Sequence, residues 1–224
     1  MAELEWARDR VARALAAGPR QRLILVAVAS LDFAAAVAGR SKQLSSPADK
    51  ALMFAWREAA DVLLVGPRTL EAERYGSLLP PDSPRPWPPV ATVSRSGVLD
   101  FERILRAKRP PELTVYGPVD PRGPVPWRPA DDLAAAVRDL RTRGAQTIVC
   151  EGGPTIYAQL VAANLATDLS LTLAPALVGA GPSLFDPVLR APARPVRTVD
   201  VAAVGDHVFL HYDLSSQAST STIR

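Results

Sequence analysis

The chain has 224 residues, of which 48% are hydrophobic and 22% charged, and its formal net charge is +3. These values are typical of a globular protein with one large or two small domains. The arginines are scattered among acidic residues instead of forming a stripe, which argues against a nucleic-acid-binding surface. The longest apolar run, Leu23–Ala29, is far shorter than the roughly 20 residues of a membrane-spanning helix, and acidic residues interrupt the N-terminus where a signal peptide would be apolar.

The single cysteine, Cys150, cannot form an internal disulfide, so we expect a reducing, cytoplasmic location. Together with His207 and His211 it does not make a zinc site of the usual kind, and we expect no metal. The two histidines fall on one face of an expected strand. Because no carboxylate partner is evident nearby in the sequence, we expect them to be structural or to face solvent.

Residues 1–20 have the charge pattern of a short amphipathic helix, which we interpret as an appendage packed on the main domain. The apolar run Arg22–Ser30 predicts a central strand covered on both faces. Ser46 is a suitable N-cap and Pro47 a suitable first residue for a helix that continues to about Ala60.

The remaining elements follow from apolar runs, helical spacing and turn residues. In chain order we expect a strand at Asp61–Gly66, a helical turn at Leu70–Arg74, a strand at Pro89–Ser94, a helix at Leu99–Lys108, a strand at Leu113–Tyr116, a helix at Asp131–Arg143, a strand at Thr147–Cys150, a helix from Pro154 to Asn164, a strand at Asp168–Val178, and a hairpin of Val196–Val204 and His207–Leu214 that turns at Gly205-Asp206.

Alternating strands and helices predict an α/β fold with a mostly parallel sheet, to which the terminal hairpin adds antiparallel strands. We expect one domain over residues 21–214 and a disordered tail over 215–224. The apolar strand Asp168–Val178 is either a dimer surface or a core strand.

Ligands of open α/β sheets bind at the carboxyl ends of the strands. These ends carry Ser30–Asp32, Gly66–Thr69, Ser94-Arg95, Tyr116–Pro118 and Glu151–Gly153. Acids, arginines, hydroxyls and glycines therefore meet at one edge, as expected for a phosphate-bearing cofactor beside a polar substrate. Glycines followed by a helix start favour an anion site, although an ordinary tight turn has the same residues. The usual dinucleotide, P-loop and hydrolase motifs are absent from the sequence.

Seven short motifs of this sequence occur in the same order as in a known protein family. They are SLD at Ser30–Asp32, LSSPAD at Leu44–Asp49, ADVLLVGPRT at Ala60–Thr69, AERYG at Ala72–Gly76, VSRS at Val93–Ser96, EGGPT at Glu151–Thr155 and LAPALVGAG at Leu173–Gly181. The chain resembles the reductase domain of riboflavin biosynthesis, the C-terminal half of the bacterial bifunctional deaminase/reductase, and in particular the free-standing actinobacterial-type pyrimidine reductases. The resemblance covers Leu23 to Tyr212.

This resemblance implies a dihydrofolate-reductase-like fold, NADPH as cofactor and a homodimer. The family reduces the ribose of a phosphorylated pyrimidine, 5-amino-6-(5-phosphoribosylamino)uracil or its diaminopyrimidinone analogue, to ribityl. We expect no deaminase half, since its zinc ligands are missing from the sequence.

Where this sequence matches the motifs of the family, the resemblance implies that the matching residues have the same roles. The cofactor-binding residues implied are Val28, Gln43, Gly66, Arg68, Thr69, Ser94, Arg95, Gly152, Gly153, Pro154, Thr155 and Ile156. The substrate-binding residues implied are Asp32, Ser41, Arg57, Tyr75 and Glu151, and the catalytic ones are Asp32, Glu73 and Glu151. Arg95 is expected to bind the 2′-phosphate and Gly153–Thr155 the pyrophosphate. Asp32, Glu73 or a bound water is expected to supply the proton.

The chain departs from the family pattern at several positions. Phe33 replaces a glycine, Pro67-Arg68 replaces Ala-Gly, Gln43 stands where tryptophan is frequent, and Glu73-Arg74-Tyr75 replaces Asp-Asp-Pro. These departures leave open two other functions on the same fold. One is the reduction of dihydrofolate or another pteridine, and the other is non-catalytic binding of NADPH.

Overall fold

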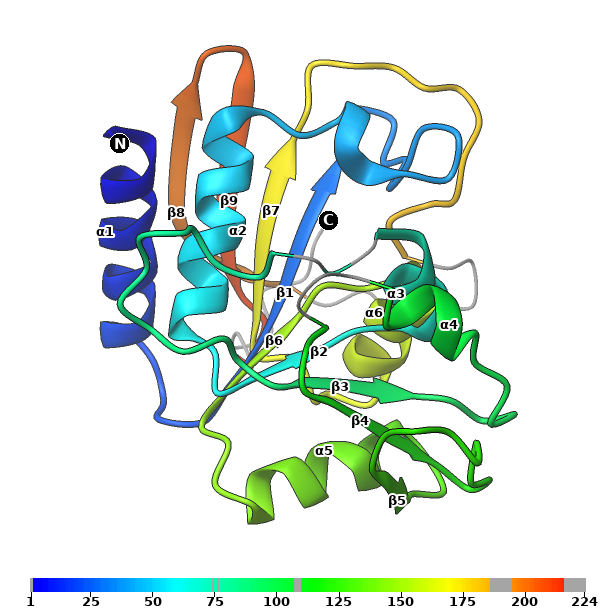
Figure 1. Cartoon of the computed structure of the whole chain (residues 1–224). Coiled ribbons are helices and arrows are strands. Elements are labelled where there is room, and N and C mark those ends of the chain that lie inside the picture. The colour runs from blue at the N-terminus through cyan, green and yellow to red at the C-terminus, as the bar shows by residue number, and fades with distance from the viewer. Residues whose placement is uncertain (1, 74, 76, 107–109, 186–194, 216–224) are drawn as a thin grey trace.

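A computed structural model describes residues 2–73, 75, 77–106, 110–185 and 195–215 (Figure 1). Its helices are α1 (Ala2–Ala16), the 3-10 turn η1 (Ser41–Gln43), α2 (Pro47–Ala59), α3 (Pro67–Glu73), α4 (Phe101–Ile104), α5 (Leu133–Thr142) and α6 (Pro154–Ala162). Its strands are β1 (Arg22–Ala29), β2 (Val62–Leu64), β3 (Val90–Val93), β4 (Leu113–Gly117), β5 (Trp127–Pro129), β6 (Thr147–Cys150), β7 (Asp168–Leu173), β8 (Arg197–Val204) and β9 (His207–Asp213).

The strands form one nine-stranded sheet in the order β5-β4-β3-β2-β6-β1-β7-β9-β8. Neighbours from β5 to β7 run parallel, and the hairpin β8–β9 adds two antiparallel strands beside β7. The predicted α/β fold with a terminal antiparallel hairpin is therefore confirmed. β6 comes late in the chain, yet it lies between β1 and β2, which are the first two strands.

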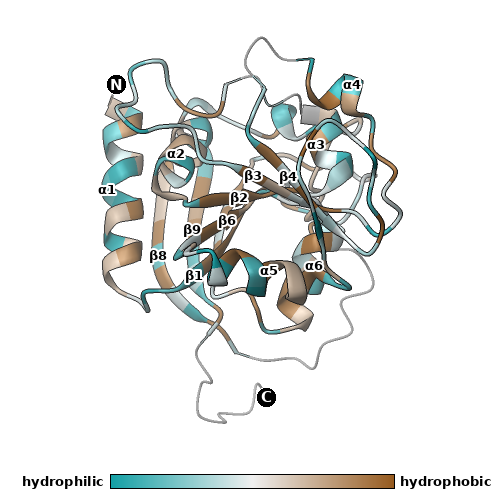
Figure 2. Ribbon diagram, turned by 60° about the horizontal axis from the view of Figure 1, so that its bottom comes forward, coloured by the Kyte–Doolittle hydropathy of each residue, from teal (hydrophilic) through white to brown (hydrophobic). Residues whose placement is uncertain are grey.

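Helices cover both faces of the sheet (Figure 1). Along β1, Leu23 and Leu25 pack with α5 and α6, whereas Ile24 packs with α1 and α2 on the other face. Successive side chains of a strand point to opposite faces, so a continuous apolar run is what a doubly covered strand needs. Burying one such side chain contributes about 1.5–3 kcal/mol relative to leaving it exposed. Figure 2 shows the resulting pattern, with hydrophobic strands inside and hydrophilic stretches on the outer helices.

The predicted starts of α2 at Pro47 and α6 at Pro154 are confirmed, whereas α3 begins at Pro67 instead of Leu70 and α5 at Leu133 instead of Asp131. The Ser46 hydroxyl accepts a hydrogen bond from the Asp49 amide at 3.2 Å, and Pro47 is the first residue of α2. Asp132 caps α5 in the same way, accepting from the Ala135 amide at 2.7 Å. No helix among the described residues is long and apolar enough to cross a bilayer.

Three element predictions need correction. The strand predicted over Asp168–Val178 ends at Leu173, where its pairing with β9 stops and Pro175 soon follows. The helix predicted over Leu99–Lys108 is only α4, Phe101–Ile104, and Lys108 lies outside the described residues. Strand β5 was not predicted because Trp127–Pro129 lies in a proline-rich segment. Its position at the edge of the sheet explains why proline is tolerated there.

Residues 216–224, most of the tail predicted to be disordered, lie outside the described part of the chain. β7 lies inside the sheet between β1 and β9, so its apolar sequence is explained by burial in the core.

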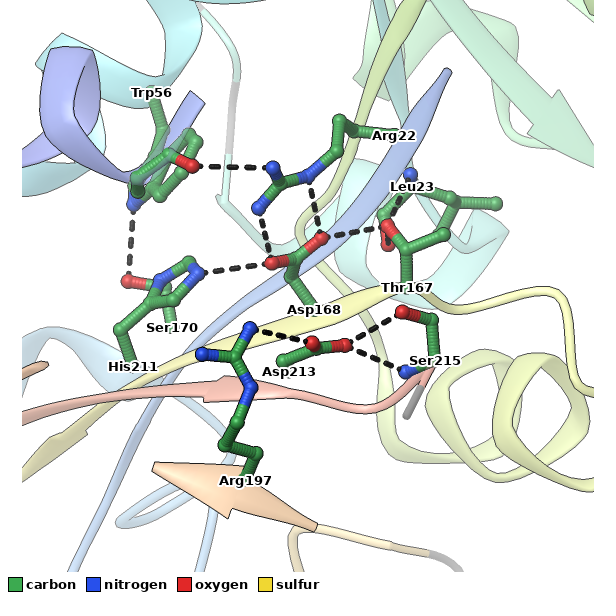
Figure 3. A network of polar contacts seen from close by, with 11 residues as sticks. Arg22, Leu23, Trp56, Thr167, Asp168, Ser170, Arg197, His211, Asp213 and Ser215 are labelled. Carbon is green, nitrogen blue, oxygen red and sulfur yellow. Dashed lines mark hydrogen bonds and ion pairs between the residues drawn. The ribbon is translucent and has the colours of Figure 1, made fainter. Parts of the chain in front are cut away.

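A buried polar network joins β1, β7 and β9 (Figure 3). The Asp168 carboxylate accepts hydrogen bonds from the Arg22 guanidinium, from Thr167 Oγ1 at 2.6 Å and from His211 Nε2 at 2.9 Å. Burial acts to raise the pKa of Asp168, but these hydrogen bonds outweigh it and lower the pKa. His211 also stacks on the Trp56 ring, with centroids 5.7 Å apart. The expectation that neither histidine has a carboxylate partner is therefore wrong for His211, because Asp168 is distant in sequence and adjacent in the sheet.

Candidate active site

The sheet opens at the carboxyl end of β6. Leu25 opposite Cys150 is the last register pair between β1 and β6, while β1 continues to Ala29 paired with β7 alone. Beyond Leu25 the β6-facing edge of β1 is therefore free of a strand, and the Val26 carbonyl there accepts a hydrogen bond from Tyr157 Oη at 2.6 Å. Alternate residues of a strand direct their peptide groups to the same side, so Val28 presents its own to the same open edge. A gap of this kind at a reversal of strand order is where α/β sheets bind ligands.

Two glycine turns face each other beside this opening. The Gly66 amide, after β2, donates to the Gly152 carbonyl, after β6, at 2.5 Å. A Cβ on Gly66 would lie 2.9 Å from the Gly153 nitrogen, and one on Gly153 would lie 3.0 Å from Thr69 Oγ1. The peptide bond between Gly152 and Gly153 is cis. Only residues without a side chain fit here, and their backbones are open to close approach by a ligand.

Helix α6 begins directly at this turn. Gly153 is its N-cap and has no side chain to cap the first amides, and Pro154 is its first residue. Thr155 is exposed and Ile156 is buried in the core against the strands. The helix start thus offers the positive end of its dipole to the space next to Thr69 and Gly66, which is a favourable place for an anion.

Basic side chains stand at the neighbouring strand ends. Arg95 is exposed directly after β3, and Ser94 before it is buried with its amide bonded to the Tyr116 carbonyl at 2.8 Å. Arg68 is exposed in the first turn of α3. The predicted cofactor residues of β2, β3 and β6 therefore lie at adjacent strand ends of the same sheet edge.

Three predicted substrate residues meet in one cluster, Arg57–Glu151–Tyr75. The Arg57 guanidinium binds the Glu151 carboxylate with two hydrogen bonds, of 2.5 Å from Nε and 2.7 Å from Nη2. Tyr75 Oη donates to Glu151 Oε2 at 2.9 Å, and the Arg57 guanidinium lies 5.2 Å from the centre of the Tyr75 ring. A further guanidinium nitrogen of Arg57 donates to the Leu78 carbonyl at 3.3 Å.

The Arg57–Glu151–Tyr75 cluster is largely buried, and it pairs the positive charge of Arg57 with the carboxylate of Glu151. The side chains of Arg57 and Glu151 are 9% and 8% exposed. Burial acts to lower the pKa of Arg57, but the charge and hydrogen bonds of Glu151 outweigh it and raise the pKa, so the guanidinium stays charged. Burial raises the pKa of Tyr75, and Glu151 raises it further, so this phenol stays protonated. The Glu151 side chain therefore accepts three hydrogen bonds, which fix it in place as an acceptor.

Asp32 belongs to a different cluster. Its carboxylate accepts from Ser30 Oγ at 2.5 Å and from the amides of Val178 and Gly179, the latter at 2.7 Å. The Ser30 hydroxyl first, and then these amides, lower the pKa of Asp32 to about 2. Asp32 therefore fixes the loop after β7 to the end of β1, and it is ionised near neutral pH, which disfavours it as the proton donor.

The remaining predicted residues are Ser41, Gln43 and Glu73. Ser41 and Gln43 form η1, with Gln43 exposed and Ser41 partly buried. Glu73 is the last residue of α3, and its side chain lies outside what the structure describes.

Sequence reasoning missed one acid at this edge, Asp49. It lies in the first turn of α2, and its carboxylate accepts from Ser45 Oγ at 2.5 Å and from the Thr172 hydroxyl. The motif LSSPAD contains it, but an acid in the first turn of a helix is expected there for capping and the helix dipole alone. Only the position of β7 shows that a buried threonine meets it.

A hollow of about 320 Å3 lies elsewhere, between α1, α2 and strands β7–β9. Arg10, Trp56 and His211 are among its lining residues, and it shares none with the predicted site. The hollow is therefore separate from the predicted site.

The chain is similar to a known protein family and to several solved structures. Residues 21–210 match the family model of the RibD C-terminal domain. A pyrimidine reductase-like protein of Corynebacterium diphtheriae is 22% identical, with a TM-score of 0.73 over 86% of this chain and 91% of that one. The riboflavin biosynthesis reductase of Saccharomyces cerevisiae is 18% identical, with a TM-score of 0.64 over 88% and 93%.

A longer protein of Thermotoga maritima, a diaminohydroxyphosphoribosylaminopyrimidine deaminase/5-amino-6-(5-phosphoribosylamino)uracil reductase, is 18% identical with a TM-score of 0.72, and the match covers 87% of this chain but only 56% of that one. No curated protein matches the chain by sequence. The family match covers most of the chain and agrees in fold with these structures, so the protein belongs to the RibD C-terminal domain family of riboflavin-biosynthesis reductases.

Proposed function

We propose that this protein is an NADPH-dependent reductase that converts the ribose of 5-amino-6-(5-phosphoribosylamino)uracil, or of its diaminopyrimidinone analogue, to ribityl. The observation that carries the proposal is the pair of facing glycine turns, Gly66 and Gly152-Gly153, at the open edge of β1. The substrate class comes from the family and from the solved reductase of Thermotoga maritima, which is described as acting on this uracil derivative.

The residues present fit a dinucleotide. The glycine turns, and the start of α6 whose N-cap Gly153 has no side chain, would give a pyrophosphate close access to the backbone, with the Thr69 hydroxyl beside it. A bound nicotinamide would supply a hydride, and the backbone of Val28 on the open edge of β1 would help to hold it. Ser94 and Arg95 after β3 would hold the adenosine end of the cofactor.

The position of Arg95 supports NADPH, instead of NADH, as the proposed cofactor. Its guanidinium is exposed at the strand end next to β2, and Arg68 is exposed at the start of α3. A guanidinium binds a phosphate with two parallel hydrogen bonds, an interaction that NADH, without the 2′-phosphate, does not offer.

The Arg57–Glu151–Tyr75 cluster supports recognition of a polar ring. Glu151 Oε1 accepts a hydrogen bond from Arg57 Nε, and a carboxyl oxygen can accept a second one, here from an amino group of a pyrimidine. Asp32 and Ser41 complete the proposed substrate side, with Asp32 holding the β7 loop and Ser41 on η1. We assign Glu73 to the space near the nicotinamide from its position at the end of α3.

A second copy of the chain is the proposed partner, in the cytoplasm. β8 is one of the two edge strands of the sheet, and its Val201 is 57% exposed. The one cysteine of the sequence, Cys150, is a fully buried free thiol, which agrees with a reducing compartment. Sedimentation equilibrium of wild type and Val201→Asp tests the dimer. A wild-type monomer at micromolar concentration would remove that part of the proposal.

The function is tested by following NADPH oxidation with three candidate substrates, namely the uracil derivative, the diaminopyrimidinone analogue and dihydrofolate. We expect one of the two pyrimidines to have the highest kcat/KM. Preference for dihydrofolate would instead assign the chain to the pteridine reductases. Binding of NADPH without turnover of any of the three would make it a non-catalytic member of its family.

A further inference from the structure

Asp49 lies where the open edge of β1 and the start of α2 meet. Its hydroxyl partner Thr172 is in β7 and stands opposite Val28 of β1 in the register of the sheet. The Asp49 carboxyl is therefore at the level of Val28, whose backbone faces the proposed nicotinamide position. Asp49 as a whole residue is partly exposed.

The contacts of Asp49 differ from those of a helix cap. A capping acid at this position reaches back to the backbone amide of the N-cap residue and is stabilised in its ionised form by the helix dipole. The Asp49 carboxylate instead accepts from two hydroxyls that lie outside α2, Ser45 Oγ at 2.5 Å and that of Thr172. Those contacts direct it toward β7 and the sheet.

The environment of Asp49 favours a bound proton. Burial raises the pKa of Asp49, and the hydroxyls of Ser45 and Thr172 and the charge of His207 on β9 only partly oppose it. Tyr157 of α6, the other titratable group that interacts with it, has a pKa raised by burial and stays neutral. Asp32 has a pKa lowered to about 2 by Ser30 and two loop amides, and the Glu151 side chain already accepts hydrogen bonds from Arg57 and Tyr75. Among the described carboxyls of this edge, Asp49 therefore has the environment of a proton donor.

We propose that Asp49 is the acid of this site and gives its proton to the substrate during reduction. The assignment rests on the proposed function. With a ribosylamino substrate, the C1′–O4′ bond breaks and its electron pair goes to O4′, which takes the Asp49 proton. The exocyclic nitrogen lone pair forms a C1′=N bond, which the hydride then reduces, so the ribityl product gains one proton and one hydride. The Asp49 carboxylate left behind is stabilised by the Ser45 and Thr172 hydroxyls and regains a proton from solvent.

The first experiment needs neither cofactor nor substrate. Infrared difference spectra of the free protein between acid and neutral pH report the carbonyl band of protonated carboxyl groups. We expect a band that titrates above the ordinary aspartate pKa of about 3.9, that is lost in Asp49→Asn and that is retained in the exposed control Asp131→Asn. Absence of any Asp49-dependent band above that pH would overturn the proposal whatever the substrate is.

The second experiment measures kcat, KM and NADPH affinity across pH with the substrate on which wild type is most active. In Asp49→Asn we expect kcat to fall about 10²–10⁴-fold, with NADPH affinity changed only a few-fold. The wild-type decline of kcat with rising pH should be absent in this variant. In Thr172→Val the decline should move to higher pH, because the ionised carboxyl loses a donor. Wild-type kcat and pH profile in a folded Asp49→Asn protein would exclude Asp49 as the acid.

These experiments separate the two proposals. If wild type prefers dihydrofolate, the proposed substrate is wrong, while the infrared band and the pH profile with dihydrofolate still decide the role of Asp49. If a pyrimidine is reduced and Asp49→Asn is fully active, the function stands and Asp49 is not the acid.

Discussion

The Arg57 guanidinium and the Glu151 carboxylate form a bidentate ion pair across 94 positions of the chain, with hydrogen bonds of 2.5 and 2.7 Å. The pair exists because β6 is inserted next to β2 and brings Glu151 under the last turn of α2. Removing one member of a buried pair leaves the other charge without a partner in a medium that solvates it poorly.

We therefore expect Glu151→Ala to lower the free energy of unfolding by about 3–5 kcal/mol, measured by urea denaturation. The variant should lose turnover while the remaining folded protein still binds NADPH. Glu58→Ala is a matched control, because Glu58 also forms a bidentate pair, with Arg8, whose side chain is 40% exposed. That change should cost about 0–1 kcal/mol. Equal costs for the two variants, or full activity in Glu151→Ala, would contradict the role given to Glu151.

Replacing Arg95 by alanine should separate the two nicotinamide cofactors. A hydrogen bond to a charged group contributes about 1.5–3 kcal/mol, so NADPH affinity should fall roughly 10- to 150-fold while NADH affinity changes little. Titration of each cofactor by protein fluorescence provides the measurement. Arg103→Ala is the control, because Arg103 is exposed on α4 and outside the predicted site. If both cofactors lose affinity equally, Arg95 does not bind the 2′-phosphate.

Adding one methyl group at Gly66 should damage the cofactor turn. The new Cβ would lie 2.9 Å from the Gly153 backbone nitrogen, which moves only if the β6–α6 turn moves. We expect Gly66→Ala to weaken NADPH binding at least tenfold, measured by isothermal titration calorimetry. Gly205→Ala is the control: its φ of +58° makes the substitution strained, by about 1–2 kcal/mol, but it lies in the β8–β9 turn. Unchanged binding in Gly66→Ala would argue against a cofactor at this turn.

The Asp168 network should make stability depend on pH in the acid range. The pKa of Asp168 is lowered in the folded state, so its ionised form stabilises the fold at pH values above the unfolded pKa of about 3.9. This contribution is lost as the pH falls through the folded pKa. Asp168→Asn should therefore be less stable than wild type at pH 7, and the difference should shrink below pH 4 in urea titrations. The exposed Asp9→Asn serves as control, and a difference independent of pH would show that the carboxylate charge is not what stabilises the network.

Local rules explain why much of the fold was predictable. The continuous apolar run of β1 indicated a strand covered on both faces, Ser46-Pro47 marked the start of α2, and Gly205-Asp206 marked the hairpin turn. These signals lie within a few residues of the element they specify. Where the outcome depended on a distant partner they failed: β5 needed β4 beside it, and β7 ended where β9 no longer paired with it.

The sequence by itself determined the α/β class, the order of the strands along the chain and the glycine turn that opens α6. Only the tertiary structure decided which strands are neighbours, and so which side chains meet. It joined Arg57 to Glu151, gave His211 its partner Asp168, and enclosed Asp49 between Ser45 and Thr172. The physical reason is that periodicity and capping act along the chain, whereas burial, charge pairing and proton affinity depend on the groups that folding brings together in space.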